Sequence, residues 1–362
     1  MQAERKIAFV VDALPVMGGS ERVLLAALEL FPRARVHTLV YRPEQFAGTP
    51  LAGREIVTSF IDGLPLAHRA YRSYLPLMPR AVEALKLGGH DLVISFSYAV
   101  AHGAQPGAGA RHLSYNFTPM RYAWRGPDEV AGEMWRHPML QDLMEHFRRW
   151  DRQAAARVDR FAAVSNAIAA RVQDAYQRGA EVIYPPVDVE RFRPMAPRGD
   201  YYITIARLVP HKRLDLIVEA FSRLRLPLVI VGEGPEYARL ERAAGANIRL
   251  AGRQSDSVVT DLLGRARGFV CAAEEDFGIA IVEAQAAGCP VLAFGRGGAL
   301  ETIQEMKTGM LFGEQSVAGL IQAMELFEQA VDSFRPEDMS ANARRFSPAR
   351  FKEEFSTFVA SA

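Results

Sequence analysis

Short apolar runs alternate with longer amphipathic stretches along most of the chain. The short runs end at Gly, Pro, Ser or Asp, and several are apolar throughout, which is typical of parallel strands buried on both faces. The longer stretches repeat apolar residues at helical spacing. Because the two patterns alternate, the sequence predicts βαβ units and an α/β fold with two doubly wound parallel sheets.

The predicted elements fall into two similar halves. In the first half, strands are expected at 6–11, 91–97, 112–117, 160–165 and 181–184. In the second half, they are expected at 201–206, 227–231, 247–251, 268–272 and 290–294. Helices are expected at 21–30, 167–176, 214–224, 235–244, 256–266, 279–287, 316–328 and 348–359.

A proline-rich segment separates the halves. Pro185 and Pro186 are followed by two more prolines and a glycine within 193–200. Proline cannot continue a helix or a strand ladder, so we expect a stiff linker here. We therefore predict an N-terminal domain over 1–196, a C-terminal domain over 197–345 and a final helical segment over 346–362. A cleft between two such domains is a natural ligand site.

Composition narrows the class of protein. The 362 residues carry a net charge of +1, which argues against a nucleic-acid-binding chain. Two cysteines, Cys271 and Cys289, are too few for a disulfide scaffold and fit a reducing compartment. No signal peptide or apolar run long enough to cross a bilayer is evident, so a cytoplasmic location is expected.

The stretch 271–292 carries the most specific chemistry. A predicted strand leads into an acidic loop containing Glu275, and Glu283 is the only charged residue of the apolar helix that follows. Burying an unpaired carboxylate costs several kcal/mol, so Glu283 needs either a structural ion-pair partner or a ligand. For Glu275 the plain alternative is an exposed loop acid.

The start of the same helix offers a site for anions or hydroxyl groups. The backbone N–H groups of Phe277, Gly278 and Ile279 have no intrahelical acceptor, and the helix dipole favours negative charge there. Together with two carboxylates at different depths, this arrangement suits a sugar.

Two cations follow the first strand of the second half. Arg207 comes at the strand end, and Lys212 opens the next helix. Ligands of parallel sheets bind outside the carboxyl ends of strands, where a guanidinium and an ammonium suit a diphosphate. A solvated basic loop is the alternative.

Glycine-containing loops follow several predicted strands. Gly18 and Gly19 precede the first helix, and Gly232 and Arg253 lie in later strand-end loops. These loops allow close backbone approach to a nucleoside or its phosphates, although glycine turns are also common without a ligand. The Gly-x-Gly-x-x-Gly dinucleotide pattern is absent.

A polar and aromatic loop follows the third predicted strand. It contains Asn116, Arg121, Tyr122 and Trp124, which either bind an acceptor sugar or pack against neighbouring elements.

The segment 64–87 mixes basic and apolar residues. Arg69, Arg72, Arg80 and Lys86 suit an anionic membrane surface, but a surface loop followed by a core helix is the favoured interpretation. We predict that any membrane association is peripheral and salt-sensitive.

No metal-ligand spacing, Gly-x-Ser-x-Gly motif or P-loop is present. No metal site is therefore predicted.

Taken together, these motifs resemble the retaining GT-B-fold glycosyltransferases of family 4 over nearly the whole chain. The strongest part is Glu275 and Glu283 with seven residues between them, followed by Ala-x-Ala-x-Gly-x-Pro-Val. Gly297-Gly298, Glu301-Thr302 and the stretch 308–312 add to it. The stretches 115–124 and 182–192 look like the mannosyltransferase-type branch, whose members build bacterial O-antigen and other surface polysaccharides.

The resemblance implies a fold and a set of roles on the donor side. Two Rossmann-like domains would face a cleft, with the final helix crossing back to the first domain. Arg207 and Lys212 would bind the donor diphosphate. Glu283 would hold the ribose hydroxyls, and Glu275 would contact the hexose with help from the amides of 277–279. Gly18 and Gly19 would let the first domain approach the phosphates.

The resemblance also implies the reaction. A hexose, with mannose as the first candidate, would move from a nucleotide diphosphate sugar such as GDP-mannose to a glycan or lipid-linked acceptor with retention of configuration. Neither a metal ion nor another cofactor would be required. The expected location stays the cytoplasm, and the inner face of the membrane is where any peripheral association would occur.

Three departures from the resembling branch concern the acceptor side. Asn116 stands where a histidine is usual, and Arg125 stands where an acidic residue is usual. Ser95-Phe96-Ser97 ends the strand where the wider family often has a histidine. The donor motif is unaffected.

Two other functions stay open at this point. A partner subunit that binds nucleotide sugar without transfer would accommodate the departures. Another α/β enzyme, such as a nicotinamide-dependent dehydrogenase or a sugar-nucleotide epimerase, is disfavoured by the missing glycine pattern.

Overall fold

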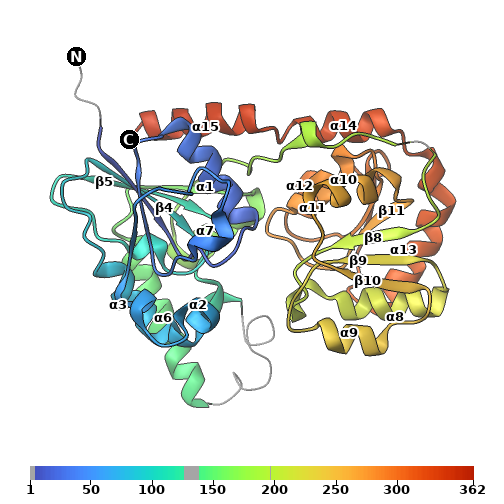
Figure 1. Ribbon diagram of the computed structural model, residues 1–362, viewed down its shortest axis with the longest axis horizontal. Helices are drawn as coiled ribbons and strands as arrows, with labels where there is room; N and C mark the ends of the chain where they lie inside the picture. The colour runs from blue at the N-terminus through green and yellow to red at the C-terminus, as the bar shows by residue number, and fades with distance from the viewer. Residues whose placement is uncertain (1–4, 126–137, 196) are drawn as a thin grey trace. The chain divides into compact units, whose positions relative to one another are not determined.

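A computed structural model of the chain describes residues 5–125, 138–195 and 197–362. The chain divides into two compact units (Figure 1). Unit 1 comprises residues 1–186 and 351–362, and unit 2 comprises residues 187–350. Each unit is built on one parallel sheet flanked by helices, so the predicted α/β class with two doubly wound sheets is confirmed.

The sheet of unit 1 has seven strands in the order β3-β2-β1-β4-β5-β6-β7, all paired in parallel. The strands are β1 (Ile7–Val11), β2 (Arg35–Thr38), β3 (Ile56–Thr58), β4 (Leu92–Ser97), β5 (Arg111–Asn116), β6 (Arg160–Ala163) and β7 (Ala180–Val182). The strand order reverses between β1 and β4, and every residue of β4 is buried because helices or loops cover both faces.

The helices of unit 1 connect these strands. They are α1 (Gly19–Leu30), α2 (Ala67–Ala70), α3 (Met78–Glu83), α4 (Arg121–Trp124), α6 (Pro138–Ala155) and α7 (Asn166–Tyr176). Short 3-10 helices are η1 (Pro43–Phe46), η2 (Phe60–Gly63), η3 (Tyr71–Leu77) and η4 (Ala101–Gly103).

Helix α15 (Pro348–Ala360) completes unit 1 with its last residues. The side chains of Phe351, Phe355 and Phe358, which the sequence places on one face, are fully buried. Phe355 stacks on Phe96 of β4 with ring centroids 5.9 Å apart and meets Tyr115 of β5 edge-on at 6.1 Å. The segment 351–362 thus packs on the sheet that residues 7–182 build, which is why it belongs to unit 1.

The sheet of unit 2 has six strands in the order β10-β9-β8-β11-β12-β13, again all parallel. The strands are β8 (Tyr202–Ile205), β9 (Leu228–Val231), β10 (Ile248–Gly252), β11 (Gly268–Cys271), β12 (Val291–Phe294) and β13 (Gly309–Phe312). The order reverses between β8 and β11. Two chain segments therefore leave this point in opposite directions and open a crevice at the carboxyl ends of the strands.

The helices of unit 2 are α8 (Leu214–Leu224), α9 (Tyr237–Ala243), α10 (Asp256–Arg265), α11 (Ile279–Ala286), α12 (Ala299–Thr302), α13 (Val317–Ala330) and α14 (Pro336–Arg344). Short 3-10 helices are η6 (Val189–Arg191), η7 (Pro210–Lys212) and η8 (Val331–Ser333). Helices α8 and α13 share an apolar core with the sheet, in which Phe221 and Phe327 both lie against Tyr202.

Every strand and helix that the hydrophobic pattern predicts is present, with ends shifted by at most two residues. The pattern missed three strands, β2, β3 and β13, and the helices α6 and α14, together with the one-turn helices α2, α4 and α12. Strands β2 and β3 mix apolar with polar residues, and β3 lies at the sheet edge. Helix α6 carries many charged residues, so its apolar positions are sparse.

The division between the units differs from the predicted boundaries at 196 and 345. It falls after residue 186 and again after residue 350. The backbone N–H of Val187 donates to the Phe346 carbonyl at 2.8 Å, and the Met195 N–H donates to the Gly264 carbonyl at 3.3 Å. The expectation of a linker throughout 185–200 is therefore wrong, because the described residues from Val187 onward pack as part of unit 2.

Candidate functional site

The predicted donor residues of unit 2 gather at the point where its strand order reverses. Arg207 follows β8, and Glu275 follows β11, the neighbouring strand. Both loops leave the carboxyl ends of their strands, so they line the same crevice. The sequence predicted that each loop follows a strand end, and the structure adds that the two strands are neighbours.

Lys212 and Glu275 form an ion pair at this crevice. The ammonium nitrogen Nζ of Lys212, at the end of η7, lies 2.7 Å from both carboxylate oxygens of Glu275. The side chains are 23% and 17% exposed, so the pair is shielded but within reach of solvent. A half-buried ion pair of this kind can exchange one partner for a ligand of the same charge.

Cys271 ends β11 next to this pair. Its Sγ lies 3.8 Å from Glu275 Oε1. Burial raises the pKa of the Cys271 thiol to about 12, and the negative charge of Glu275 acts in the same direction. The thiol therefore stays protonated near neutral pH and does not act as a nucleophile.

Two glycines after β12 fix the loop that carries Glu275. The Gly298 N–H donates to the Glu275 carbonyl at 2.7 Å, and Gly297 pairs with Glu275 as an isolated bridge. A Cβ at Gly298 would fall 2.4 Å from the Phe277 backbone. Only glycine allows the two loops to approach so closely, which holds the Glu275 backbone in place.

Helix α11 begins directly after this loop. Its first flanking residue, Gly278, has φ +94°, a left-handed conformation that favours glycine. Phe277 and Gly278 are buried and Ile279 is half-buried. The N-terminus of the buried helix thus follows the Glu275 loop within a few residues, as the sequence predicted.

Arg207 lies beside a second close approach of backbone. It is exposed, and the loop that contains it is bonded to the loop after β9 through Leu208 N–H and the Glu233 carbonyl at 2.9 Å. Gly232 has φ +143°, and a Cβ there would lie 1.9 Å from the Ala206 carbonyl oxygen. The exposed Arg253 follows β10. These three residues therefore lie at the carboxyl ends of β8, β9 and β10.

Glu283 has a partner that the sequence did not reveal. Arg191 of η6 donates to Glu283 Oε1 at 3.1 Å and to Asp256 at 2.5 Å. The side chain of Glu283 is 8% exposed, whereas that of Asp256 is 70% exposed. The ion-pair interpretation of Glu283 is thus correct for this structure, and no spacing in the sequence links residues 92 positions apart.

The predicted residues of unit 1 are spread over several loops. Gly18 and Gly19 follow β1 and begin α1, and a Cβ at Gly18 would lie 3.0 Å from a carboxylate oxygen of Glu21. Their contact with a donor stays a prediction.

Two of the suggested acceptor residues are engaged in the fold. Asn116 is fully buried in β5, so its side chain is not accessible to an acceptor in this structure. The Trp124 indole N–H donates to Asp151 at 2.6 Å, and the Arg152 guanidinium lies 4.8 Å from its ring centroid. Of the two roles expected for Asn116 and Trp124, packing within the fold therefore agrees better with this structure than binding of an acceptor sugar.

The other two suggested residues are partly buried in the same loop, and Tyr122 packs against the apolar core of unit 1. Arg121 and Tyr122 are half-buried at the start of α4. Burial raises the pKa of the Tyr122 hydroxyl to about 12, and the neighbouring Tyr71 adds to this effect. Tyr122 stays a neutral hydroxyl that can donate to an acceptor near neutral pH.

Two histidines of unit 1 belong to buried polar networks. The Nδ1 of His102 lies 2.9 Å from Ser97 Oγ, and its Nε2 lies 2.9 Å from Asp151 Oδ1. His112 lies 3.0 Å from Ser95 Oγ, and burial lowers its pKa to about 3. Both histidines are at most 1% exposed, so neither reaches a substrate in this structure.

Asp12 at the end of β1 holds the loop after β4. Its carboxylate accepts four backbone N–H groups, from Tyr98, Ala99, Val100 and Ala101, at 2.6–3.0 Å. Burial nevertheless raises the pKa of Asp12, although all four bonds oppose this shift. The loop at the carboxyl end of β4 is thus fixed to β1, which the sequence alone did not predict.

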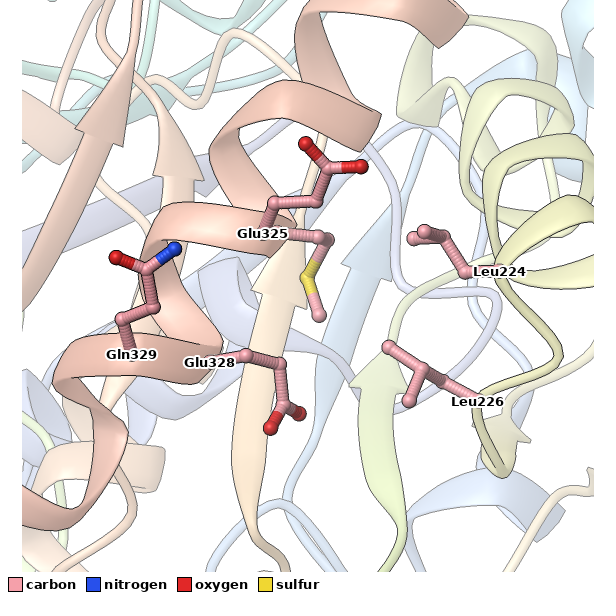
Figure 2. Close-up of a pocket in the computed structure, with 6 residues that line it drawn as sticks. Leu224, Leu226, Glu325, Glu328 and Gln329 are labelled. Atoms are coloured by element: carbon pink, nitrogen blue, oxygen red, sulfur yellow. The ribbon is translucent and has the colours of Figure 1, made fainter.

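A pocket elsewhere in unit 2 is separate from the crevice. It holds about 410 Å³ between the end of α8 and helix α13 (Figure 2). Leu226 precedes β9 and so lies near the amino ends of the strands. Glu328 accepts the Tyr202 hydroxyl and pairs with Arg267 at 3.0 Å. Its charge is therefore already compensated. The lining residues are Leu224, Leu226, Met324, Glu325, Glu328 and Gln329.

Across residues 5–125, 138–195 and 197–362, no cluster of three or more His, Cys, Asp or Glu side chains has the geometry to hold a metal ion.

Sequence comparison identifies both halves of the chain. The model of the glycosyl transferases group 1 matches residues 190–346, and that of Glycosyltransferase Family 4 matches residues 17–191. Together they span both parallel sheets. The chain belongs to the GT-B glycosyltransferases of family 4. Membership of this family removes the dehydrogenase and epimerase alternatives.

Two curated relatives of this glycosyltransferase are mannosyltransferases. The GDP-mannose-dependent alpha-(1-6)-phosphatidylinositol monomannoside mannosyltransferase of Mycobacterium tuberculosis is 31% identical over 222 aligned positions, and the match covers 52% of this chain and 57% of that enzyme. The monoacylated-substrate counterpart from Corynebacterium glutamicum is 28% identical over 63% of this chain and 68% of its own. The match thus spans little more than half of the mycobacterial enzyme.

Solved structures agree on the fold. HepE from Anabaena, in complex with UDP and glucose, superposes with a TM-score of 0.75 at 16% identity, covering 99% of this chain and 100% of its own. Sucrose-phosphate synthase from Thermosynechococcus elongatus gives 0.76 at 16% identity over 99% of both chains. At this identity the likeness shows the GT-B fold alone.

The Arg191–Glu283 pair yields a stability prediction. Arg191→Met removes a cation that pairs with the nearly buried Glu283 carboxylate, so the free energy of unfolding falls by about 3–5 kcal/mol. In the double variant with Glu283→Gln, the loss is smaller than the sum of the two single losses, because no buried charge is left. Denaturant unfolding of the four proteins measures both values.

The control is Arg223→Met, which removes an exposed arginine paired with Glu219 on α8. We expect a change of less than about 1 kcal/mol there. An Arg191 variant as stable as this control would contradict the role given to the pair.

Proposed function

We propose that this chain transfers a hexose from a nucleotide diphosphate sugar to a glycan or lipid-linked acceptor, with retention of the anomeric configuration. The observation that carries the proposal is the Lys212–Glu275 pair at the reversal of strand order, with Arg207 on the adjoining loop. GDP-mannose is the proposed donor, because the two mannosyltransferases similar to this chain depend on it by name.

The two cations have a clear task in such a transfer. When the bond between the anomeric carbon and the diphosphate breaks, negative charge builds on the leaving group. Arg207 offers a planar fork and Lys212 a point charge at the carboxyl end of β8. Fixed positive charge placed where negative charge develops is an effective way to lower a reaction barrier. We propose that these groups act without a metal ion.

The Lys212–Glu275 contact indicates how the donor enters. A phosphate of the donor competes with the Glu275 carboxylate for the Lys212 ammonium, since both are oxyanions. Once Lys212 has turned to the phosphate, Glu275 is available to accept hydrogen bonds from hexose hydroxyls. The Glu275 carboxylate keeps its charge in the crevice, so the diphosphate adds negative charge there, and the Arg207 guanidinium offsets part of it.

The remaining donor groups are assigned along α11. Glu283 Oε1 accepts from Arg191, and its carboxylate has further lone pairs for the ribose hydroxyls. The N–H groups at the start of the helix face the Glu275 loop and suit the hexose or its phosphate.

Retention follows if the acceptor attacks from the face that the diphosphate leaves. The acceptor oxygen forms a bond to the anomeric carbon as the carbon–oxygen bond to the diphosphate breaks. The proton of the acceptor hydroxyl then passes to the departing phosphate oxygen. No protein base is needed, which agrees with the burial of His102 and His112.

Substitution of the cations tests the proposal. We expect Arg207→Ala and Lys212→Ala each to lower kcat/KM for transfer from GDP-mannose by roughly 10²–10³-fold, because each removes charge stabilisation from the leaving group. Transfer is measured with a radiolabelled sugar on a membrane-lipid extract, and donor hydrolysis is measured in parallel.

Arg223→Ala is the matched control, because it removes an exposed arginine from the same unit. Full transfer in the Arg207 and Lys212 variants would show that the phosphate assignment is wrong. Absence of both transfer and hydrolysis in the unmodified protein would favour the partner-subunit alternative. The assays are run in EDTA, and a loss of activity that magnesium restores would overturn the metal-free proposal.

We also propose that unit 1 docks peripherally on an anionic membrane through the segment 60–86. Phe60, Leu66 and Leu77 are large apolar side chains at the surface, and Leu66 is 68% exposed. Four exposed basic residues accompany them: Arg69, Arg72, Arg80 and Lys86. Basic and apolar side chains together suit the headgroup region of a bilayer. Within the part of the chain that the structure describes, no helix is long and apolar enough to cross a membrane.

Sedimentation with phosphatidylglycerol vesicles tests this docking. We expect the bound fraction to fall as salt rises from about 0.05 to 0.5 M, because the Debye length shrinks. Arg69→Gln combined with Arg80→Gln lowers binding at low salt, whereas Arg239→Gln combined with Arg249→Gln in unit 2 leaves it unchanged. A bound fraction that changes neither with salt nor with the unit 1 substitutions would contradict the proposal.

A further inference from the structure

An open cavity of about 840 Å³ lies in unit 1 at the amino ends of its strands. Residues of the segment before β1, of the turn between α1 and β2, of the turn before β4 and of helix α15 line it. The donor residues of the other unit lie at the carboxyl ends of strands. The cavity therefore belongs to neither the crevice of unit 2 nor the loops that follow β1 and β4.

The cavity has cationic walls. Five of its lining residues carry basic side chains, and none of the fifteen is acidic. The basic residues are Arg5, Lys6, Arg33, Arg35 and His90. A concave site with one sign of charge focuses its field and attracts ions of the opposite sign.

The backbone on one side of the cavity is anchored by polar contacts. The Lys6 N–H donates to the Asp91 carboxylate at 2.8 Å, and Arg5 donates to the Ala362 carbonyl at 2.7 Å. Arg35 makes only a long contact of 3.6 Å with Glu55, in which both side chains are mostly exposed. Such a contact is weak and can yield to a ligand.

A buried histidine, His37, lies next to one of the basic residues that line the cavity. His37 of β2 is 2% exposed, and its ring meets that of His90 edge-on at 5.7 Å. Neither ring nitrogen of His37 has a hydrogen-bond partner within the described residues. Burial lowers the pKa of His37 to about 4, and the positive charges of His90 and Arg35 contribute. Burial is thus the main reason that His37 is neutral near neutral pH, and the nearby basic residues of the cavity act in the same direction.

The other wall is apolar. Leu30, Phe31 and Pro32 line it from the end of α1, and Val359 lines it from α15. Phe31 is held edge-on against Phe9 at 6.2 Å and against Phe355 at 6.4 Å. This wall is therefore a preformed surface that an apolar group can cover without rearrangement.

We propose that this cavity binds an anionic amphiphile, namely a phosphate ester whose apolar group lies on the Phe31–Val359 wall while its phosphate meets Arg33 and Arg35. The volume falls within the range of about 300–1,000 Å³ that is usual for ligand sites. Because the cavity lies in unit 1, at the amino ends of its strands, and the donor residues lie in unit 2, its ligand acts as an effector or an anchor and is not consumed.

Titration calorimetry with octyl phosphate, below its micellar concentration, tests the proposal. We expect one site per chain and octyl phosphate binding at least roughly tenfold tighter than that of inorganic phosphate or octanol. Inorganic phosphate lacks the apolar group that covers the apolar wall, and octanol lacks the phosphate. Arg33→Gln combined with Arg35→Gln lowers the affinity for octyl phosphate at least about tenfold by removing the phosphate partners. Ser356→Trp, which keeps every charge, lowers it by filling the cavity.

Arg239→Gln combined with Arg249→Gln is the control, because it removes the same charge from two exposed arginines of unit 2, outside the cavity. It leaves octyl phosphate binding unchanged, and circular dichroism verifies that all variants fold. The proposal is overturned if the unmodified chain does not bind octyl phosphate, or if the two double variants bind it with equal affinity. It is also overturned if Ser356→Trp leaves the affinity unchanged.

Vesicles that contain phosphatidic acid distinguish the two sources of such a ligand. If a membrane lipid fills the cavity, Arg33→Gln with Arg35→Gln binds the vesicles more weakly than the unmodified chain. If the variant binds them equally well but has lost octyl phosphate, the ligand is a soluble phosphate ester.

Discussion

The ion pair between Lys212 and Glu275 is the interaction on which the account of this molecule depends. It exists because β8 and β11 are neighbours at the reversal of strand order, so the loops that follow them share one crevice. A cation and an anion held there at 2.7 Å satisfy each other without a ligand. In the proposed reaction they act as a switch, because a phosphate of the donor takes the place of the carboxylate beside the Lys212 ammonium.

Other polar contacts of the molecule are more deeply buried and do not suit an exchange of partners. Glu283 is nearly buried against Arg191, and Asp12 receives four backbone donors inside unit 1. Breaking such contacts leaves uncompensated buried charge, so they are permanent supports. The Lys212–Glu275 pair is more exposed than either, and this difference in burial separates the group that can exchange partners from the groups that hold it in place.

Local pattern was sufficient for most of the fold. Continuous apolar runs were enough to predict β4, β8 and β11. Helix α11 was predicted from an apolar run in which Glu283 is the one charged residue. Strands β2 and β3 were not predicted because their apolar and polar residues alternate too irregularly. The predicted boundary of unit 1 differs from the observed one because the backbone of Val187 bonds to that of Phe346, far away in sequence. Non-local contacts of that kind leave no periodic signal.

The same distinction applies to the candidate site. Residue type and strand-end position were enough to select Lys212, Arg207 and Glu275. They did not identify Arg191 as the partner of Glu283, nor Asp12 as the anchor of the loop after β4. On the acceptor side, Asn116 and Trp124 looked accessible because a polar loop was expected, yet the sheet and Asp151 take up both side chains. The basic cavity of unit 1 depends on five residues from three separate segments, which only the folded chain brings together.

The most direct measurement is the affinity of Glu275→Gln for GDP, determined by titration calorimetry. GDP has diphosphate but no hexose, so Glu275 acts toward it only as a competitor for Lys212. The exchange of partners predicts that the variant binds GDP more tightly than the unmodified chain, by roughly fivefold or about 1 kcal/mol. An affinity that is unchanged or weaker would contradict the exchange, and with it the assignment of the crevice to the donor diphosphate.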